Sequence, residues 1–165
     1  MNRLILLRHG NAEQDSEHGG DFARELSAEG RTESWATGET LLGLGLIPDL
    51  VLASSAARTR GTWAAMASLF PKSVVQLEDG LYLAESSAIR EAVRKAAPTC
   101  ETLLVVGHNP GIQDLVLDML RESSGPLSVI SRVESRFPTA AAAVFVIDAQ
   151  GRPLYDGLFF PDKVR

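Results

Sequence analysis

The chain has 165 residues, of which 45% are apolar and 22% are charged, and its formal net charge is −5. These values are ordinary for a soluble protein, so we expect a single domain over residues 1–165 with a substantial core. The first residues do not show a signal-peptide pattern, and the longest apolar run, residues 140–147, is far below the ~20 residues that span a bilayer, so a cytoplasmic location is expected. The charge argues against general binding to nucleic acid or to a membrane surface, so an anion site must be a local cluster of positive charge.

Apolar runs predict six strands, at residues 4–8, 49–53, 73–77, 102–107, 140–147 and 153–159. Helical patterns lie between the earlier strands, at residues 27–44, 55–70, 86–97 and 111–122, and Ser27 is placed to cap the first helix. This alternation predicts an α/β fold, a three-layer α/β/α domain with a mostly parallel sheet. Residues 148–151 resemble a hairpin connection, which predicts an antiparallel edge strand. Residues 11–26 and 122–138 are expected to be long loops.

Chemically capable side chains follow three of the predicted strands directly. Arg8 and His9 follow the first strand, Arg58 lies at the start of the helix after the second, and His108 follows the fourth. Ligands bind at the carboxyl ends of strands in open α/β sheets, and helix N-termini favour anions. Each group alone is more simply explained as structural, but the three together predict a cleft that binds an anion.

Two histidines and two arginines around one anion suit phosphoryl transfer. A neutral imidazole is a nucleophile toward phosphorus, and a protonated imidazole donates a hydrogen bond to the transferring group. An arginine guanidinium group binds two phosphate oxygens through bidentate hydrogen bonds and supplies positive charge. No cofactor and no metal are therefore expected. His9 and His108 therefore predict a phosphohistidine intermediate.

Four segments resemble, in order and spacing, the histidine phosphatase superfamily, in the branch that includes phosphoglycerate mutase. They read LILLRHGNAE, RELSAEG, VLASSAARTRGT and VVGHNPG. The short length and the segment FPTAAAAVFVID are most similar to the SixA-type phosphohistidine phosphatases. The resemblance implies that His9 is the phosphorylated nucleophile and that Arg8, Arg58 and His108 complete the catalytic phosphate pocket. It also implies that Asn11 and Arg24 bind substrate.

The chain departs from this family in two places. Glu25 stands where a proline usually follows the arginine of the second segment. Many members also carry a glutamate as general acid after the third strand, where this chain has Gly80. Three acidic residues lie close by: Glu78, Asp79 and Glu85. Whether any of them acts as the general acid is open at this point.

The resemblance implies a metal-independent phosphatase that hydrolyses phosphohistidine, with a phosphorylated phosphotransfer protein as the expected partner and a monomer as the expected state. A phosphatase or mutase for small phosphorylated molecules is the second hypothesis, and a non-catalytic phosphate-binding module is the third. His18 is expected in a surface loop, and the single cysteine, Cys100, has no assigned role. Trp35, Trp63 and Met66 have helical spacing and are expected in the core.

Overall fold

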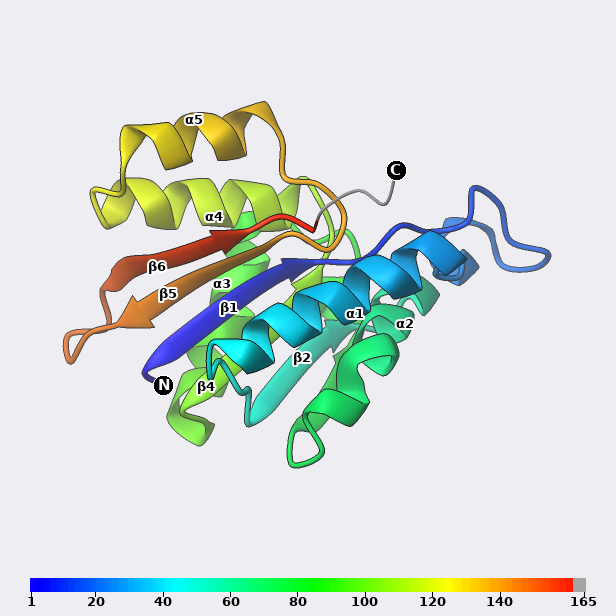
Figure 1. The fold of residues 1–165 in the computed structure, drawn as a ribbon, viewed down its shortest axis with the longest axis horizontal. Helices are drawn as coiled ribbons and strands as arrows, with labels where there is room; N and C mark the ends of the chain where they lie inside the picture. The colour runs from blue at the N-terminus through cyan, green and yellow to red at the C-terminus, as the bar shows by residue number, and fades with distance from the viewer. Residues whose placement is uncertain (162–165) are drawn as a thin grey trace.

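The computed structural model describes residues 1–161 and places six strands in one sheet, in the order β3-β2-β4-β1-β5-β6 (Figure 1). The strands are β1 (Arg3–Arg8), β2 (Leu50–Ser54), β3 (Val74–Glu78), β4 (Thr102–Gly107), β5 (Ala142–Ile147) and β6 (Pro153–Phe159). The first four strands run parallel, while β5 and β6 are antiparallel to their neighbours. The predicted α/β fold with an antiparallel edge is therefore confirmed.

Helices cover both faces of this sheet. They are α1 (Ala28–Gly43), α2 (Ala57–Met66), α3 (Ser86–Ala96), α4 (Gly111–Glu122) and α5 (Leu127–Ser135). Figure 1 shows α1 and α2 on one face, α3 and α4 on the other, and α5 lying outside α4. Ser27 caps α1 as predicted, since its side-chain oxygen accepts a hydrogen bond from the Gly30 N–H at 3.0 Å.

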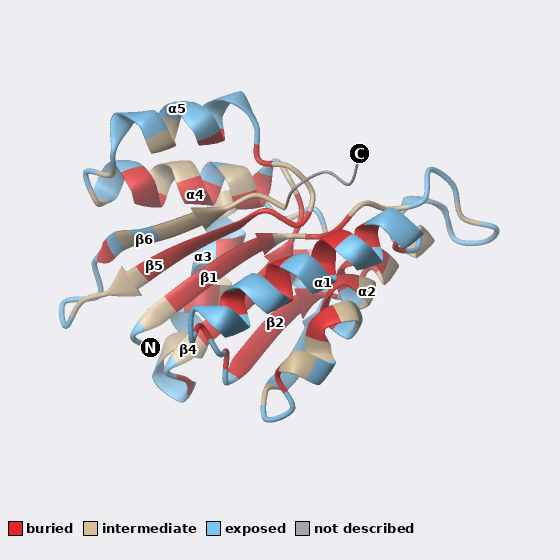
Figure 2. Ribbon diagram, in the orientation of Figure 1, coloured by how far each residue is buried: buried red, intermediate tan, exposed pale blue. Residues whose placement is uncertain are grey.

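Strand β1 is buried on both sides, which explains its continuous apolar sequence. Leu4 and Leu6 pack with residues of α3 and α4, whereas Ile5 and Leu7 pack with residues of α1 and α2. All four side chains are at most 1% exposed (Figure 2), and each contributes about 1.5–3 kcal/mol by leaving water. The strand therefore has little freedom to move, and the residues that follow its carboxyl end have a fixed position.

Two expectations from the sequence are wrong. Residues 122–138 are not a single long loop, because they contain α5, which begins after Pro126 and buries Val133 against the core. The serines, glycine and prolines around this segment hid its short helical pattern. Trp35 is not a core residue, because it lies on the outer side of α1 with 39% of its surface exposed, while Trp63 and Met66 are buried.

The segment from residue 11 to residue 26 is a long excursion with little regular structure, as predicted. A bridge between Ala12 and Leu26 closes its base, and a short 3-10 helix, η1 (Gly20–Ala23), lies within it. His18 is exposed in this segment, as expected. Among residues 1–161, no helix is both long enough and apolar enough to cross a bilayer.

Candidate active site

The carboxyl ends of β1, β2 and β4 lie side by side and frame a cavity of about 380 Å³. The register pairs Arg8 directly with Gly107, so the residues that follow these two strands come together. All six residues singled out from the sequence line this cavity: Arg8, His9, Asn11, Arg24, Arg58 and His108. Asp21, Leu83 and Thr139 are among the other lining residues. The structure thus brings the predicted residues to one place.

The His9 side chain is held with one ring nitrogen free. Its Nδ1 lies 2.7 Å from the carbonyl oxygen of Gly10, and because a carbonyl only accepts, Nδ1 carries the proton. Nε2 is then the unprotonated nitrogen with an available lone pair. Burial lowers the pKa of His9 to about 3, so the ring is neutral at physiological pH.

The backbone on either side of His9 is fixed by close contacts. The Ala140 N–H lies 3.1 Å from the Arg8 carbonyl and 3.0 Å from that of His9, and Ala140 has a positive φ of 57°. Gly10 donates its N–H to the Thr62 hydroxyl at 2.9 Å. A Cβ at Gly10 would lie 2.6 Å from the Gly30 carbonyl oxygen, so only glycine fits there.

His108 lies across the cavity from His9, with ring centroids 5.2 Å apart. Its Nε2 is 2.8 Å from the Ser54 hydroxyl, and its Nδ1 is buried with no hydrogen-bond partner among the described residues. Burial, and then the positive charge of Arg58, lower the pKa of His108 to about 4. The ring is therefore neutral at physiological pH, and an anion bound beside it would raise this pKa.

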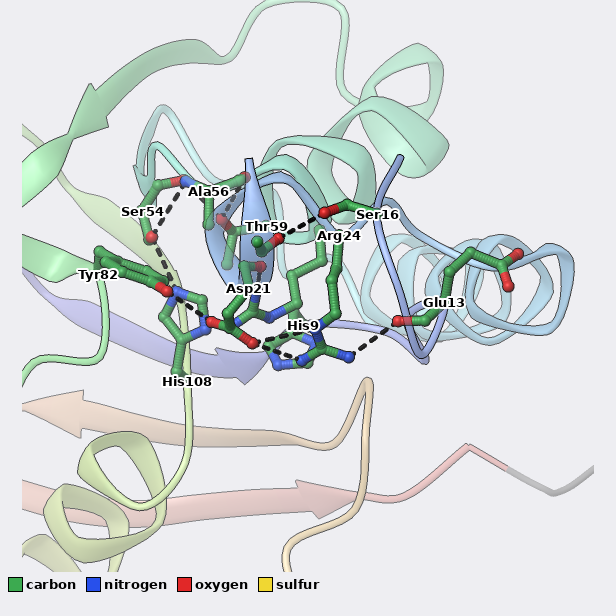
Figure 3. A network of polar contacts seen from close by, with 12 residues as sticks. His9, Glu13, Ser16, Asp21, Arg24, Ser54, Ala56, Thr59, Tyr82 and His108 are labelled. Carbon is green, nitrogen blue, oxygen red and sulfur yellow. Dashed lines mark hydrogen bonds and ion pairs between the residues drawn. The ribbon is translucent and has the colours of Figure 1, made fainter. Parts of the chain in front are cut away.

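The arginines differ in how their guanidinium groups are used. Arg8 donates to the Phe137 carbonyl at 3.0 Å, and its Nε has no partner among residues 1–161. Arg58, in the first turn of α2, donates from one terminal nitrogen to the Asp21 carbonyl at 2.7 Å and from the other to the Asp21 carboxylate at 3.0 Å. Arg24 also donates to this carboxylate, at 3.0 Å from its Nε (Figure 3).

Asn11 is anchored from α1 rather than turned to solvent. Its N–H donates to the Glu33 carboxylate at 2.9 Å, and its side-chain oxygen accepts from Ser27 at 2.7 Å. Thr139, on the cavity wall, donates to the same Glu33 carboxylate at 2.9 Å. Glu33 is only 7% exposed, so it is a buried anchor for two segments that border the cavity.

None of the three candidate acids reaches the cavity wall in the described part of the chain. Asp79 accepts a hydrogen bond from Ser55 at 2.5 Å, Glu78 lines a separate hollow, and Glu85 lies at the start of α3. The carboxylate that does line the cavity is that of Asp21. Hydrogen bonds from Tyr82, then Arg58 and Arg24, lower the pKa of Asp21 to about 2, so this group is ionised and holds no proton to donate.

Sequence reasoning missed Asp21, Tyr82 and Glu33. Tyr82 lies 61 residues from Asp21, and its hydroxyl donates to the Asp21 carboxylate at 2.5 Å, a contact that no local pattern signals. Glu33 could have been found, because it places a charged residue on the buried face of α1. Asn109 lines the cavity as well and does not cap α4, whose N-cap is Pro110; its side-chain amide donates to the Phe137 carbonyl at 3.0 Å.

The fold and the cavity define an α/β protein with a compact cationic site that contains two histidines. The chain belongs to the histidine phosphatase superfamily (branch 1), whose profile matches residues 4–82. An uncharacterised protein of Mycobacterium tuberculosis is 31% identical over 75% of this chain and 77% of its own length. An uncharacterised chloroplastic protein of Arabidopsis thaliana is 28% identical over 98% of this chain and 78% of its own length.

Solved structures place the chain close to SixA proteins. A protein from Agrobacterium tumefaciens with the provisional name of phosphohistidine phosphatase SixA is 27% identical, with a TM-score of 0.84 over 97% of this chain and 98% of that one. A counterpart from Nakamurella multipartita is 28% identical, with a TM-score of 0.81 over 97% of this chain and 96% of that one. The predicted superfamily and the resemblance to SixA are confirmed.

Proposed function

We propose that this protein is a metal-independent phosphatase that hydrolyses phosphohistidine on a phosphotransfer protein, through a phosphorylated His9. The observation that carries the proposal is the His9 ring itself. The ring is neutral, its Nδ1 proton is held by the Gly10 carbonyl so that Nε2 is unprotonated, and His9 lines a cavity together with Arg8, Arg58 and His108. The names of the SixA proteins of similar structure support the same substrate class.

The first chemical step transfers the phosphoryl group to the protein. His9 Nε2 attacks phosphorus, a new N–P bond forms, and the P–N bond to the substrate imidazole breaks with its electron pair going to the leaving nitrogen. The proton already carried by the substrate ring leaves it neutral after departure. Arg8 and Arg58 stabilise the charge on the phosphoryl oxygens, and His108, protonated once the anion is bound, donates a further hydrogen bond.

The second step returns the protein to its starting state. Water attacks the phosphorus of phosphorylated His9, the N–P bond breaks, and inorganic phosphate leaves. The Nδ1 hydrogen bond to Gly10 keeps the ring in one orientation through both steps, because this contact does not involve the reacting nitrogen. The positive charge needed around the phosphoryl group comes from arginine side chains, which gives the reason to propose chemistry without a metal.

Crystals soaked with tungstate test the proposed site directly. We expect the oxyanion to bind in the cavity with its metal atom facing His9 Nε2 and its oxygens within hydrogen-bond distance of Arg8, Arg58 and His108. Turnover of a phosphohistidine-containing phosphotransfer protein is measured in parallel. Binding of tungstate elsewhere, with an empty cavity, would refute the placement of the phosphoryl group.

Replacement of Arg58 separates the effect of charge from the effect of geometry. We expect Arg58→Ala to lower kcat by about 10²–10³-fold, as for loss of one donor to a developing oxyanion. Arg58→Lys is expected to be clearly impaired but less so, because lysine keeps the charge and loses the planar fork. Steady-state kinetics of both variants check this, and wild-type rates for Arg58→Lys would place Arg58 outside the reaction.

A further inference from the structure

An exposed turn reaches into the cavity with a single carboxylate, that of Asp21. The turn is η1, and it carries no buried residue of its own. The Asp21 side chain is 46% exposed, yet it binds an Arg58 side chain that is only 3% exposed. A buried guanidinium group is costly without an opposite charge, so an exposed loop supplies the anion that a deeply placed cation needs.

The contact occupies both ends of the Arg58 fork. One terminal nitrogen donates to the Asp21 carbonyl at 2.7 Å and the other to its carboxylate at 3.0 Å, while Arg58 Nε has no partner among the described residues. The orientation of the Arg58 plane is therefore determined by Asp21. Arg8, His9 and His108, whose titration responds to the charge of Arg58, bring positive charge or none and cannot take over this role. The Tyr82 ring, 5.9 Å from the Arg58 guanidinium carbon, carries no carboxylate to pair with it.

The same carboxylate also orders two further groups. Arg24 approaches it with Nε at 3.0 Å and with a terminal nitrogen at 2.9 Å, and donates its other terminal nitrogen to the Glu13 carbonyl at 2.8 Å. The Tyr82 hydroxyl donates to it at 2.5 Å. The Tyr82 ring packs edge-on against His108, with centroids 5.5 Å apart (Figure 3). It also packs edge-on against Phe22 of the turn at 4.9 Å, which ties the turn to the opposite cavity wall.

We propose that Asp21 is a positioning residue, which holds Arg58 and Arg24 at the orientation in which their remaining N–H groups receive the phosphoryl oxygens. This inference rests on the proposed function, since it takes the cavity to be the phosphoryl site. One carboxylate shared by two guanidinium groups fixes each relative to the other. Tyr82 fixes the carboxylate in turn, so the turn at residues 20–23 becomes part of the binding site.

Two opposite effects of the Asp21 charge must be weighed. A carboxylate beside an anion site repels the anion, so its removal alone would strengthen binding of phosphate. Its removal also frees one end of the Arg58 fork, while the other end stays on the Asp21 backbone carbonyl. Misplacement of a positioning group by about 1 Å can lower a rate by about 10²-fold. Because Asp21 is half exposed, water screens its repulsion, and we expect the loss of orientation to dominate.

Calorimetric titration with orthovanadate tests this without requiring turnover. We expect Asp21→Asn to weaken vanadate binding by about tenfold and Asp21→Ala by more. The asparagine side chain keeps one oxygen that accepts from Arg58, and the alanine side chain keeps none. Asp148→Asn is the matched control, because Asp148 also pairs with an arginine, Arg152 at 2.8 Å, but lies in the hairpin turn. Its vanadate affinity is expected to equal that of the wild type. Tighter binding by Asp21→Asn would show that the carboxylate competes with the oxyanion and would overturn the proposal.

A double-mutant cycle in vanadate affinity then shows whether Asp21 acts through Arg58. We expect Arg58→Lys to weaken binding much less in the Asp21→Asn background than in the wild type, because the ion pair that orients one end of the fork is already lost there. If the losses of vanadate affinity caused by the two substitutions simply multiply in the double variant, the positioning role is refuted. Failure of the wild type to bind vanadate would instead refute the proposed function, so the two failures are distinguishable. A merely structural role of Asp21 would change the melting temperature without such coupling.

Discussion

His9→Ala is expected to abolish turnover of phosphohistidine while the fold remains intact. Loss of a nucleophile that forms a covalent intermediate lowers kcat by on the order of 10⁴-fold or more. The fold should survive, because the contacts that hold this segment use the backbone of His9 and Gly10, with Ala140 and Thr62 as partners. Single-turnover kinetics with a phosphorylated substrate measure the first effect, and the melting temperature measures the second.

His18→Ala is the matched control for this experiment. His18 is exposed in the segment before η1 and does not line the cavity that holds His9, so its replacement should leave the rate unchanged. Residual activity of His9→Ala within tenfold of the wild type would exclude His9 as the nucleophile. Wild-type protein that binds vanadate but turns over no phosphohistidine or aryl phosphate would favour the phosphate-binding module instead.

The sequence predicted the residues of the candidate cavity well because its main parts are set by strand ends. The continuous apolar run of β1 required burial on both faces, and the residue after a buried parallel strand must emerge at the carboxyl edge. The same rule placed His108 after β4 and Arg58 in the first turn of α2. Local pattern and sheet topology were therefore sufficient to bring four side chains from three segments together.

The features that the sequence did not predict depend on contacts between distant segments. Asp21 and Tyr82 meet across 61 residues, and each lies in a segment without periodicity, so nothing local indicates the pair. Helix α1 gave a misleading pattern because its buried face holds small and polar residues such as Gly30, Ser34 and Thr37. Because this buried face has few large apolar side chains, the pattern wrongly assigned Trp35 to the core, although the Trp35 side chain lies on the exposed side of α1.

Among residues 1–161 no protonated carboxylic acid lines the cavity, and His108 is assigned to a phosphoryl oxygen, so we expect a strong dependence on the leaving group. Cleavage of an alkyl phosphate expels an alkoxide unless an acid donates a proton, and such an acid contributes typically 10²–10⁴-fold. Asp21, the carboxylate on the cavity wall, is ionised with a pKa of about 2 and is held by Arg58, Arg24 and Tyr82. The imidazole of phosphohistidine protonates near neutral pH on its own ring, so it departs without help from the protein.

We therefore expect kcat/KM to rise steeply as the leaving-group pKa falls across a series of aryl phosphates. Phosphohistidine should be hydrolysed far faster than phosphoserine or 3-phosphoglycerate, by about the 10²–10⁴-fold that the missing acid would have supplied. The test is to measure kcat/KM for phosphohistidine and the aryl phosphates, and for phosphoserine and 3-phosphoglycerate, at one pH under identical conditions. A flat dependence, or efficient hydrolysis of 3-phosphoglycerate, would mean that Glu78, Asp79 or Glu85 moves to the cavity when substrate binds. The side chain of Asp79, now bonded to Ser55 at 2.5 Å, would have to break that contact to do so, and the small-molecule phosphatase hypothesis would then replace ours.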